Sequence, residues 1–465
     1  MLGKLLQPEV QSLVAARDFA GLRTLFAEWP PADLAEIIAD LPEDDKVVVF
    51  RVMPQELAAG IFEYLDSDAQ EALLHSMGQE HAVKLLNEMS PDDRTALLEE
   101  LPPEAVKRLV GSLSPAERSV AQSLLGYPEK SVGRLMTPDF VAIRPDMSVQ
   151  EVLDHVRARG RDSETLNVLY VLDDHGKLID DLRIREFLIR PLHEKVSDLM
   201  NDVFVALKVT DSEESAVEVF RKYDRTVLPV VDSGGRLLGV VTVDDVLDVA
   251  QQAATEDIQK YGGLEAALDL PYMSTGLWEM FRKRGSCLVI LFLGEMLTAT
   301  AMQSFEEEIE KAVVLSLFLP LVISSGGNSG SQSSTLVIRA MALGEVKLGD
   351  WWRVARREIV SGLSLGVLLG AVGFLRILFW AVFGFAHYGP HPYILALAVG
   401  LALIGIVGWG SLAGAMLPFV LRVCRVDPAT SSAPFVATLV DVTGLIIYFL
   451  VAAAIFLPYA ANGGS

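Results

Sequence analysis

The first 130 residues carry apolar residues that return every twelve positions. Most of them are followed by Pro, Ser, Gly or Asp, as in "LPED", "MPQE" and "MSPDD". Such residues start helices, and the acidic residues beside them suit the positive end of the helix dipole. The pattern predicts helices of two to three turns that pair into hairpins and stack into a superhelix. The repeated positions are Trp29, Leu41, Met53, Leu65, Met77, Met89, Leu101 and Leu113.

A second repeat has a period of 64 residues. "LMTPDFVAI", which starts at Leu135, returns as "LMNDVFVAL" at Leu199, and each copy continues as strand, helix, strand, strand and helix. This doubled order resembles a pair of CBS modules, which are regulatory binding units. For such modules the resemblance implies an adenine nucleotide as a candidate ligand. The first copy has Asp180 where the second has Gly239, which weakens the case for a nucleotide in the first module.

Long apolar runs dominate the last third of the chain, and each is long enough to cross a hydrocarbon core of ~30 Å. Loops rich in Arg and Lys alternate with loops that lack them. The positive-inside rule then places the N-terminal body in the cytoplasm and the C-terminus outside. We therefore expect an integral protein of the plasma (inner) membrane. The expected spans are 286–305, 312–338, 355–383, 393–421 and 434–458.

The negative charge is concentrated before the membrane region. The 465 residues have a net charge of −22, yet residues 285–465 contain ten acidic and nine basic residues. An acidic body repels nucleic acid and attracts cations. This favours a cation as ligand and excludes nucleic acid as a partner.

The predicted fold is therefore multidomain. An all-α superhelical repeat domain (1–131) precedes a tandem α/β CBS pair (132–247). A connecting helical segment (248–281) then leads to a transmembrane domain of five helices (282–465).

The second predicted span contains a polar stretch, "ISSGGNSGSQSST". Asn328, Gln332 and Thr335 lie at i, i+4 and i+7, on one face of a helix. Gly326 and Gly330 form a GxxxG spacing, which permits close approach of another helix or a ligand. We expect Pro320 and the glycines to loosen backbone carbonyls for a hydrated cation. The alternative is hydrogen bonding between helices without any ligand.

Asp441 and Glu295 are carboxylates placed deep within predicted spans, Asp441 in the last and Glu295 in the first. An ionisable side chain at a helix centre costs about 2.5 to 3.5 kcal/mol on insertion scales, so it usually has a function. Because no basic residue other than Arg376 lies deep within a span, the expected partner is a mobile cation, a proton or a polar cluster. Glu295 is a possible pore residue, and Glu306 belongs to an acidic run at the outer end of the first span.

Three motifs together identify a family. "PLVISSGGNSGSQSSTLVIRAMA", "GAMLPFVLRVCRVDPA" and "PFVATLVDVTGLIIYF" resemble the MgtE magnesium transporters, and so does the order of the domains. The resemblance implies a homodimeric Mg²⁺ channel with its pore between two chains and a closing "plug" helix at about 248–272. The implied pore residues are Asp441, Asn328, Gln332, Gly326, Gly327 and Thr438.

The same resemblance implies a magnesium sensor in the acidic body. Without Mg²⁺, facing carboxylates repel one another; with Mg²⁺, ions bridge them and the plug closes the pore. Such a shift requires tighter Mg²⁺ binding in the closed state. The implied regulatory residues are Asp224, Asp244, Asp245, Asp248, Glu256, Asp257, Glu213 and Glu214.

Other classes remain as alternatives. The sequence lacks the HExxH and Walker A motifs, so a zinc protease or an ATP-driven enzyme is not expected. A CBS-regulated channel of other selectivity, a non-conducting receptor and a broader transporter of Mn²⁺ or Co²⁺ stay open.

Overall fold

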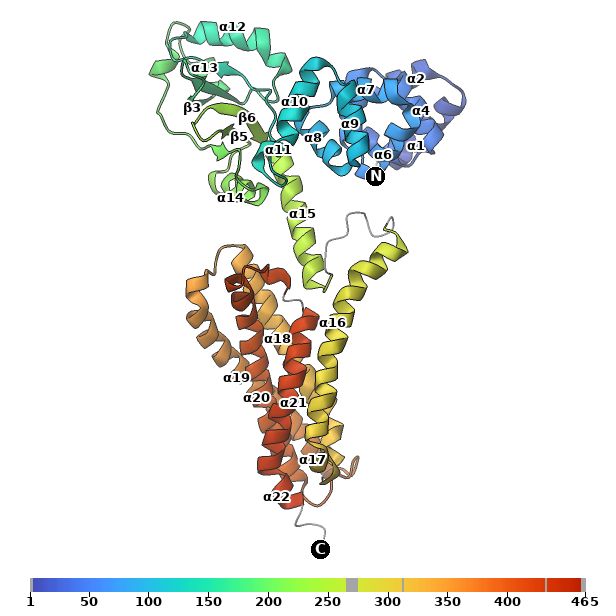
Figure 1. Ribbon diagram of the computed structural model, residues 1–465, viewed down its shortest axis with the longest axis vertical. Coiled ribbons are helices and arrows are strands. Elements are labelled where there is room, and N and C mark those ends of the chain that lie inside the picture. Colours follow the sequence, from blue (N-terminus) through green and yellow to red (C-terminus); the bar gives the residue numbers. More distant parts are fainter. Residues whose placement is uncertain (1–2, 265–274, 312, 431–432, 461–465) are drawn as a thin grey trace. The chain divides into compact units, whose positions relative to one another are not determined.

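The computed structural model describes residues 3–264, 275–311, 313–430 and 433–460 (Figure 1). The chain divides into two compact units, Met1–Gln252 and Ala253–Ser465. Part of the predicted connecting segment, residues 265–274, lies outside the described residues.

The first unit begins with the predicted helical superhelix. Its repeated residues from Leu41 to Leu113 are buried where one helix ends and the next begins. Several of the helices have a proline in their first turn, where the backbone N–H that proline lacks would have no partner within the helix. Helices two places apart pack together, for example α3 with α5 and α8 with α10, so hairpins stack as predicted. The helices are α1 (Gly3–Ala15), α2 (Phe19–Phe26), α3 (Pro31–Ala39), α4 (Glu43–Val52), α5 (Gln55–Glu63), α6 (Ser67–Met77), α7 (Gln79–Glu88), α8 (Pro91–Glu100), α9 (Pro103–Ser112) and α10 (Pro115–Leu125).

Two matching α/β modules follow, as the 64-residue repeat predicts. In each, a short strand pairs in parallel with a central strand, which pairs antiparallel with a third. Apolar residues from both sheets, including Tyr170 and Val240, form one shared core. The elements are α11 (Val132–Leu135), β1 (Ala142–Ile143), α12 (Val149–Arg159), β2 (Val168–Leu172), β3 (Leu178–Arg183), α13 (Ile184–Ile189), β4 (Leu207–Lys208), α14 (Glu213–Tyr223), β5 (Val227–Val231), β6 (Leu237–Thr242) and α15 (Val243–Tyr261).

The difference between Asp180 and Gly239 has a structural reason. The buried Asp180 carboxylate accepts hydrogen bonds from the backbone N–H groups of Asn201 (2.7 Å) and Asp202 (3.0 Å). At Gly239, an added Cβ would lie 2.6 Å from the carbonyl oxygen of Thr137, so only glycine fits. Asp180 therefore bonds the first module to the start of the second copy of the repeat, and Gly239 lets the second module approach the start of the first copy.

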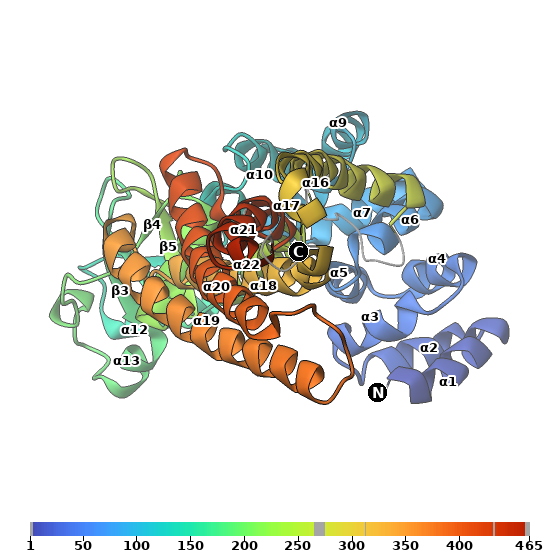
Figure 2. The same cartoon turned by 90° about the horizontal axis from the view of Figure 1, so that it is seen from below.

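The second unit contains the five predicted spans, and five helices are long and apolar enough to cross a membrane. Seen along the helices, α21 lies between α16 and α20, whereas α19 lies on the outer side of α20 (Figure 2). The helices are α16 (Leu277–Ser304), α17 (Glu306–Lys311), α18 (Leu319–Ala342), α19 (Trp351–Val382), α20 (Pro392–Val423), α21 (Ala433–Ile455) and α22 (Leu457–Ala460).

Small residues let α18 and α20 approach to backbone contact. Gly326 faces Gly410, and a Cβ on Gly410 would lie 2.5 Å from the Gly326 carbonyl oxygen; one turn on, Gly414 meets Gly330. This confirms the close approach expected from the GxxxG spacing. The expected loosening of carbonyls is wrong, because Pro320 occupies the first turn of α18 and the helix continues unbroken through the glycines.

Candidate functional site

The helix α18 presents two different polar faces. Ser329 and Ser333 are buried against neighbouring helices, where Ser329 Oγ lies 2.6 Å from Ser411 Oγ. Asn328, Gln332 and Thr335 are exposed on another face. Among the described residues of this unit, Tyr261 at the end of α15 contacts Thr335, and Asn328 and Gln332 remain exposed. A polar face that lipid cannot solvate needs either a water-filled cavity or another chain.

Asp441 lies beside this helix. A Cβ added to Gly327 would lie 3.3 Å from Asp441 Oδ1, so the missing side chain leaves room for the carboxylate. Gly326 is buried against α20 instead, where it permits helix packing. Asp441 and the polar face of α18 thus come from different spans but belong to one region.

Glu295 and Thr438 lie where α16 packs on α21. A Cβ on Gly294 would lie 2.9 Å from the methyl group of Thr438, and the Thr438 hydroxyl donates to the carbonyl of Pro434 at 3.1 Å. Glu295 is exposed and near enough to Asp441 for like-charge repulsion. Glu306 is exposed at the start of α17, with no ion pair among the described residues. Within this unit, the structure therefore brings Glu295 to Asp441 and leaves Glu306 at a helix end.

A dense cluster of carboxylates lies in the first unit. Asp92 and Asp93 start α8, Glu63 ends α5, and Asp245 and Asp248 lie in the first two turns of α15. With Glu213 they line a cavity of about 450 Å³. A second cavity of about 520 Å³ is lined by Glu63, Glu117, Asp139 and Glu164.

Burial and mutual repulsion perturb these acids strongly. Burial first, and the charge of Asp92 next, raise the pKa of Asp245 to about 8. The same two causes raise the pKa of Glu164 to about 7, and burial together with Asp93 raises the pKa of Glu63 to about 7. The pKa of Asp93 rises to about 6 by burial and the charge of Asp92. A cation bound among these carboxylates would stabilise their ionised forms and reduce their mutual repulsion.

Two arginines near the cluster are paired with glutamates. The buried Arg94 guanidinium lies 2.5 Å from a Glu117 carboxylate oxygen, and Arg134 pairs with Glu99. Among the described residues, no three His, Cys, Asp or Glu side chains are arranged to hold a metal ion directly. The cluster therefore offers charge and space rather than a closed coordination shell.

The predicted regulatory residues fall into several places. Asp244 repels the buried Asp92, while Asp245, Asp248 and Glu213 line the acidic cavity. Glu214 is exposed on α14. Asp224 ends α14 in a left-handed conformation (φ 51°) and lines a different cleft.

Sequence reasoning missed Glu63, Asp92, Asp93, Asp139 and Glu164. Asp92 and Asp93 were explained by the helix dipole, since "SPDD" is an ordinary helix start. Ser90 does cap α8 by accepting from the Asp93 N–H. Nothing in the local pattern indicated that these acids would meet those of α15.

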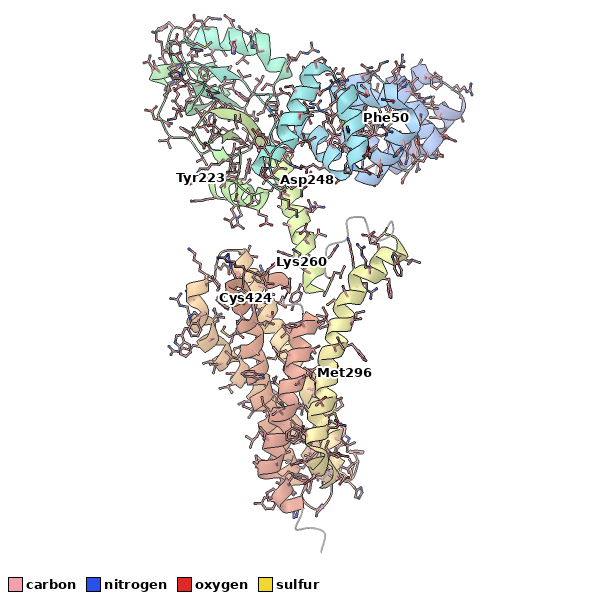
Figure 3. All side chains as sticks on the ribbon, viewed as in Figure 1. Phe50, Tyr223, Asp248, Lys260, Met296 and Cys424 are labelled. Carbon is pink, nitrogen blue, oxygen red and sulfur yellow. The ribbon has the colours of Figure 1, made fainter. Side chains whose placement is uncertain are left out.

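The helix α15 carries Asp245 and Asp248 near its start and Glu256 and Asp257 near its end, so the last CBS helix and the predicted plug are one element (Figure 3). Its last turn is fastened within the second unit. Lys260 pairs with Glu256 at 3.6 Å and with Asp427, in the α20–α21 loop, at 3.0 Å. The Tyr261 hydroxyl donates to the Ser331 carbonyl at 2.9 Å and contacts Thr335 on α18.

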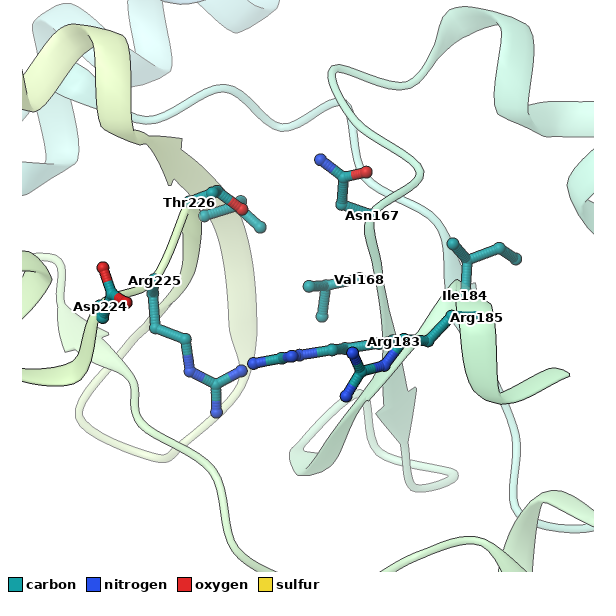
Figure 4. A pocket seen from close by; sticks show the side chains of 9 residues that line it. Asn167, Val168, Arg183, Ile184, Arg185, Asp224, Arg225 and Thr226 are labelled. Carbon is teal, nitrogen blue, oxygen red and sulfur yellow. The ribbon is translucent and has the colours of Figure 1, made fainter. Parts of the chain in front are cut away.

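A cleft of about 370 Å³ lies between the two α/β modules (Figure 4). Arg183 and Arg185 reach it from the end of β3 and the start of α13, and Arg225 comes from the segment before β5. Arg225 also lies 3.5 Å from Asp181. Three guanidinium groups around one cleft suit the phosphate groups of a polyanion.

Three family models match the chain. The MgtE intracellular N domain matches residues 29–130, the CBS domain matches 132–190 and 196–251, and the MgtE divalent cation transporter matches 319–451.

Individual relatives of this chain come from the same family as these models. The magnesium transporter MgtE of Thermus thermophilus is 42% identical over 335 residues, or 72% of this chain and 72% of that protein. The magnesium transporter MgtE of Enterococcus faecalis is 29% identical over 344 residues, or 74% and 73% of the two chains. A crystal structure of the cytosolic domain of the Mg²⁺ channel MgtE in complex with ATP is 34% identical, with a TM-score of 0.50, and covers 52% of this chain and 100% of that one. The chain therefore belongs to the MgtE family of magnesium transporters.

Proposed function

We propose that two copies of this chain form a Mg²⁺ channel of the plasma (inner) membrane, with the pore between them. The observation that carries the proposal is the exposed polar face of α18 beside Asp441, in helices long enough to span a membrane. A second copy would cover this face and place two Asp441 carboxylates around one axis. The acidic domains are cytoplasmic and the C-terminus lies outside. The chain acts as a transporter rather than an enzyme.

The pore chemistry follows from how Mg²⁺ holds water. Mg²⁺ demands octahedral oxygen coordination and gives up its waters reluctantly, so a pore that binds the hydrated ion avoids that cost. The two Asp441 carboxylates would accept hydrogen bonds from the ion's water shell. The side-chain oxygens of Asn328 and Gln332 would contact the same shell. Thr438 sits one turn before Asp441 and supports the α16–α21 contact.

Transport selectivity is the first test. The purified chain in liposomes should carry Mg²⁺ down its gradient, with Mn²⁺ and Co²⁺ offered separately. Mg²⁺ flux above the protein-free background supports the proposal, and its absence contradicts it. A higher flux of Mn²⁺ or Co²⁺ would favour the second candidate, a broader transporter, which the divalent cation transporter model also fits.

The acidic cluster serves as the cytosolic Mg²⁺ sensor in this proposal. Mg²⁺ between α5, α8 and α15 would offset the burial and the mutual repulsion that raise the pKa of Asp245 and of Glu63. Because α15 ends at Tyr261 and Lys260, ordering its start would favour the contacts of its last turn with α18 and with Asp427. Closure of the pore would then follow a rise in Mg²⁺.

Limited proteolysis tests the sensor separately from the pore. A fragment of residues 1–270 should become more resistant to protease as Mg²⁺ rises to millimolar concentration. Equal resistance with and without Mg²⁺ would contradict the sensor and leave the pore proposal untouched.

An adenine nucleotide is the proposed ligand of the CBS cleft. The three arginines supply charge for its phosphates, and the cytosolic domain of an MgtE relative was crystallised with ATP. Calorimetric titration of the soluble fragment with ATP should give saturable binding that Arg185→Gln weakens.

The proposed functional domains are residues 1–131, 132–247, 248–281 and 282–465.

A further inference from the structure

The cytoplasmic end of α19 carries an arginine cluster that the transport mechanism does not use. Arg353, Arg356 and Arg357 line an open cavity of about 420 Å³ together with Val360 and Ser361. From this geometry we propose that the cavity binds the headgroup of an anionic phospholipid, whose acyl chains run along the outer face of α19. The inference goes beyond ion transport and rests only on the placement of α19 in the membrane.

The exposed face of α19 points to lipid as the occupant. Gly362, Gly366 and Gly370 are buried against α20, which fixes the opposite face as the outer one. Four side chains on that outer face are 55 to 64% exposed: Val360, Val367, Leu368 and Leu375. Helical periodicity places them on the same face as the three arginines, one to several turns further along α19. A ligand that fits both parts has an anionic head and an apolar tail.

The charge of the cluster is uncompensated within the described residues. Arg356 and Arg357 form no ion pair there, and Arg353 has a single exposed contact with Asp350 at 3.4 Å. The neighbouring acid, Glu358, accepts a hydrogen bond of 2.7 Å from Ser333 on α18 and forms no ion pair with these arginines among the described residues. The arginines are thus left to an external anion.

The groups present match a phosphate diester at the membrane surface. Guanidinium groups bind phosphate oxygens bidentately, and the Ser361 hydroxyl adds a donor. Trp351 and Trp352 precede the cluster and are 51% and 62% exposed, which is typical of side chains at the membrane–water interface. Basic residues close to the cytoplasmic end of a span attract anionic lipids.

Native mass spectrometry of the full-length protein in detergent tests the site without measuring transport. Phosphatidylglycerol and phosphatidylcholine are titrated separately into wild type and into the triple variant Arg353→Gln, Arg356→Gln, Arg357→Gln. Wild type should bind phosphatidylglycerol about tenfold or more tightly than phosphatidylcholine, and the triple variant should lose that preference. The matched control, Arg422→Gln with Arg425→Gln, removes exposed arginines beside the end of α20 and should retain it.

The proposal would be overturned by equal binding of both lipids by wild type, by a retained preference in the triple variant, by equal loss in the control, or by displacement of phosphatidylglycerol by millimolar inorganic phosphate. The last would identify a free-phosphate site instead. If the glutamine variant does not insert, the corresponding triple lysine variant decides, because it keeps the charge but lacks the bidentate fork. It should bind phosphatidylglycerol more weakly than wild type, and unchanged affinity would overturn the proposal. Mg²⁺ flux of the variants in phosphatidylcholine vesicles should stay normal, so this test and the transport test fail independently.

Discussion

Gly327 and Asp441 lie side by side where α18 meets α21, and a Cβ on Gly327 would come within 3.3 Å of an Asp441 carboxylate oxygen. The glycine therefore does more than permit helix packing, because it leaves room for the carboxylate.

Gly327→Ala should lower Mg²⁺ flux about tenfold while the protein still folds. The new methyl group would press on Asp441 and on Ala437, whose Cβ lies 3.4 Å from the added Cβ position. Flux and thermal unfolding should be measured together. Gly285→Ala is the matched control, because a Cβ there meets nothing within 4 Å. Normal flux in Gly327→Ala would show that this space is unused.

Tyr261→Phe should make channel closure less sensitive to Mg²⁺. It removes the hydroxyl that bonds α15 to the Ser331 carbonyl. One hydrogen bond contributes about 1 kcal/mol, so about fivefold more cytosolic Mg²⁺ should be needed to close half of the channels. Inside-out patch recordings measure this shift. Tyr223→Phe, which alters an exposed tyrosine on α14, should leave the dependence unchanged.

The stability of the first unit should depend on pH through Asp245. Its pKa is about 8 in the folded state and about 4 in an unfolded chain. The folded state holds this proton more tightly, so the contribution to stability is full below about pH 4 and is lost as pH rises through 8.

Asp245→Asn removes this dependence. With a chelator present to remove divalent cations, the variant should melt at nearly the same temperature as wild type at pH 5. At pH 9 it should melt at a clearly higher temperature than wild type. Calorimetry of a soluble fragment measures both. Exposed Glu214 supplies the control, Glu214→Gln. A difference between variant and wild type that does not grow with pH would contradict the raised pKa.

Glu295→Gln should reduce Mg²⁺ flux severalfold, less than changes at Asp441. Its carboxylate adds negative charge near Asp441 and so helps to attract the cation. Glu306→Gln, at the end of the same bundle, should have little effect. Equal flux in wild type and both variants would assign Glu295 to the lipid-facing surface instead.

The architecture could be predicted from the sequence because its signals are local and repeated. The twelve-residue spacing of Leu41 to Leu113 marks helix junctions directly, and the apolar runs have the length of a bilayer. The polar face of Asn328, Gln332 and Thr335 follows from helical periodicity alone, and the exposed positions agree with it.

The acidic cluster could not be predicted in full, because it depends on contacts between distant segments. Asp92 and Asp93 have a sufficient local role at the start of α8, and Glu63 ends another helix 29 residues before Asp92. The bond from Tyr261 to Ser331 joins residues 70 positions apart and has no sequence signature. The effect of Pro320 could not be predicted either, because it depends on whether the proline lies in the first turn or in the interior of a helix.

The most direct test of the account is Mg²⁺ flux through Asp441→Asn channels in liposomes. Asparagine keeps the size of the side chain and removes only its charge, so the variant should insert and assemble like wild type. We predict a loss of Mg²⁺ flux of at least about tenfold, because a hydrated divalent ion would lose its charged partner in the pore. Flux equal to that of wild type in the correctly inserted variant would contradict the claim that Asp441 is the ion-binding residue.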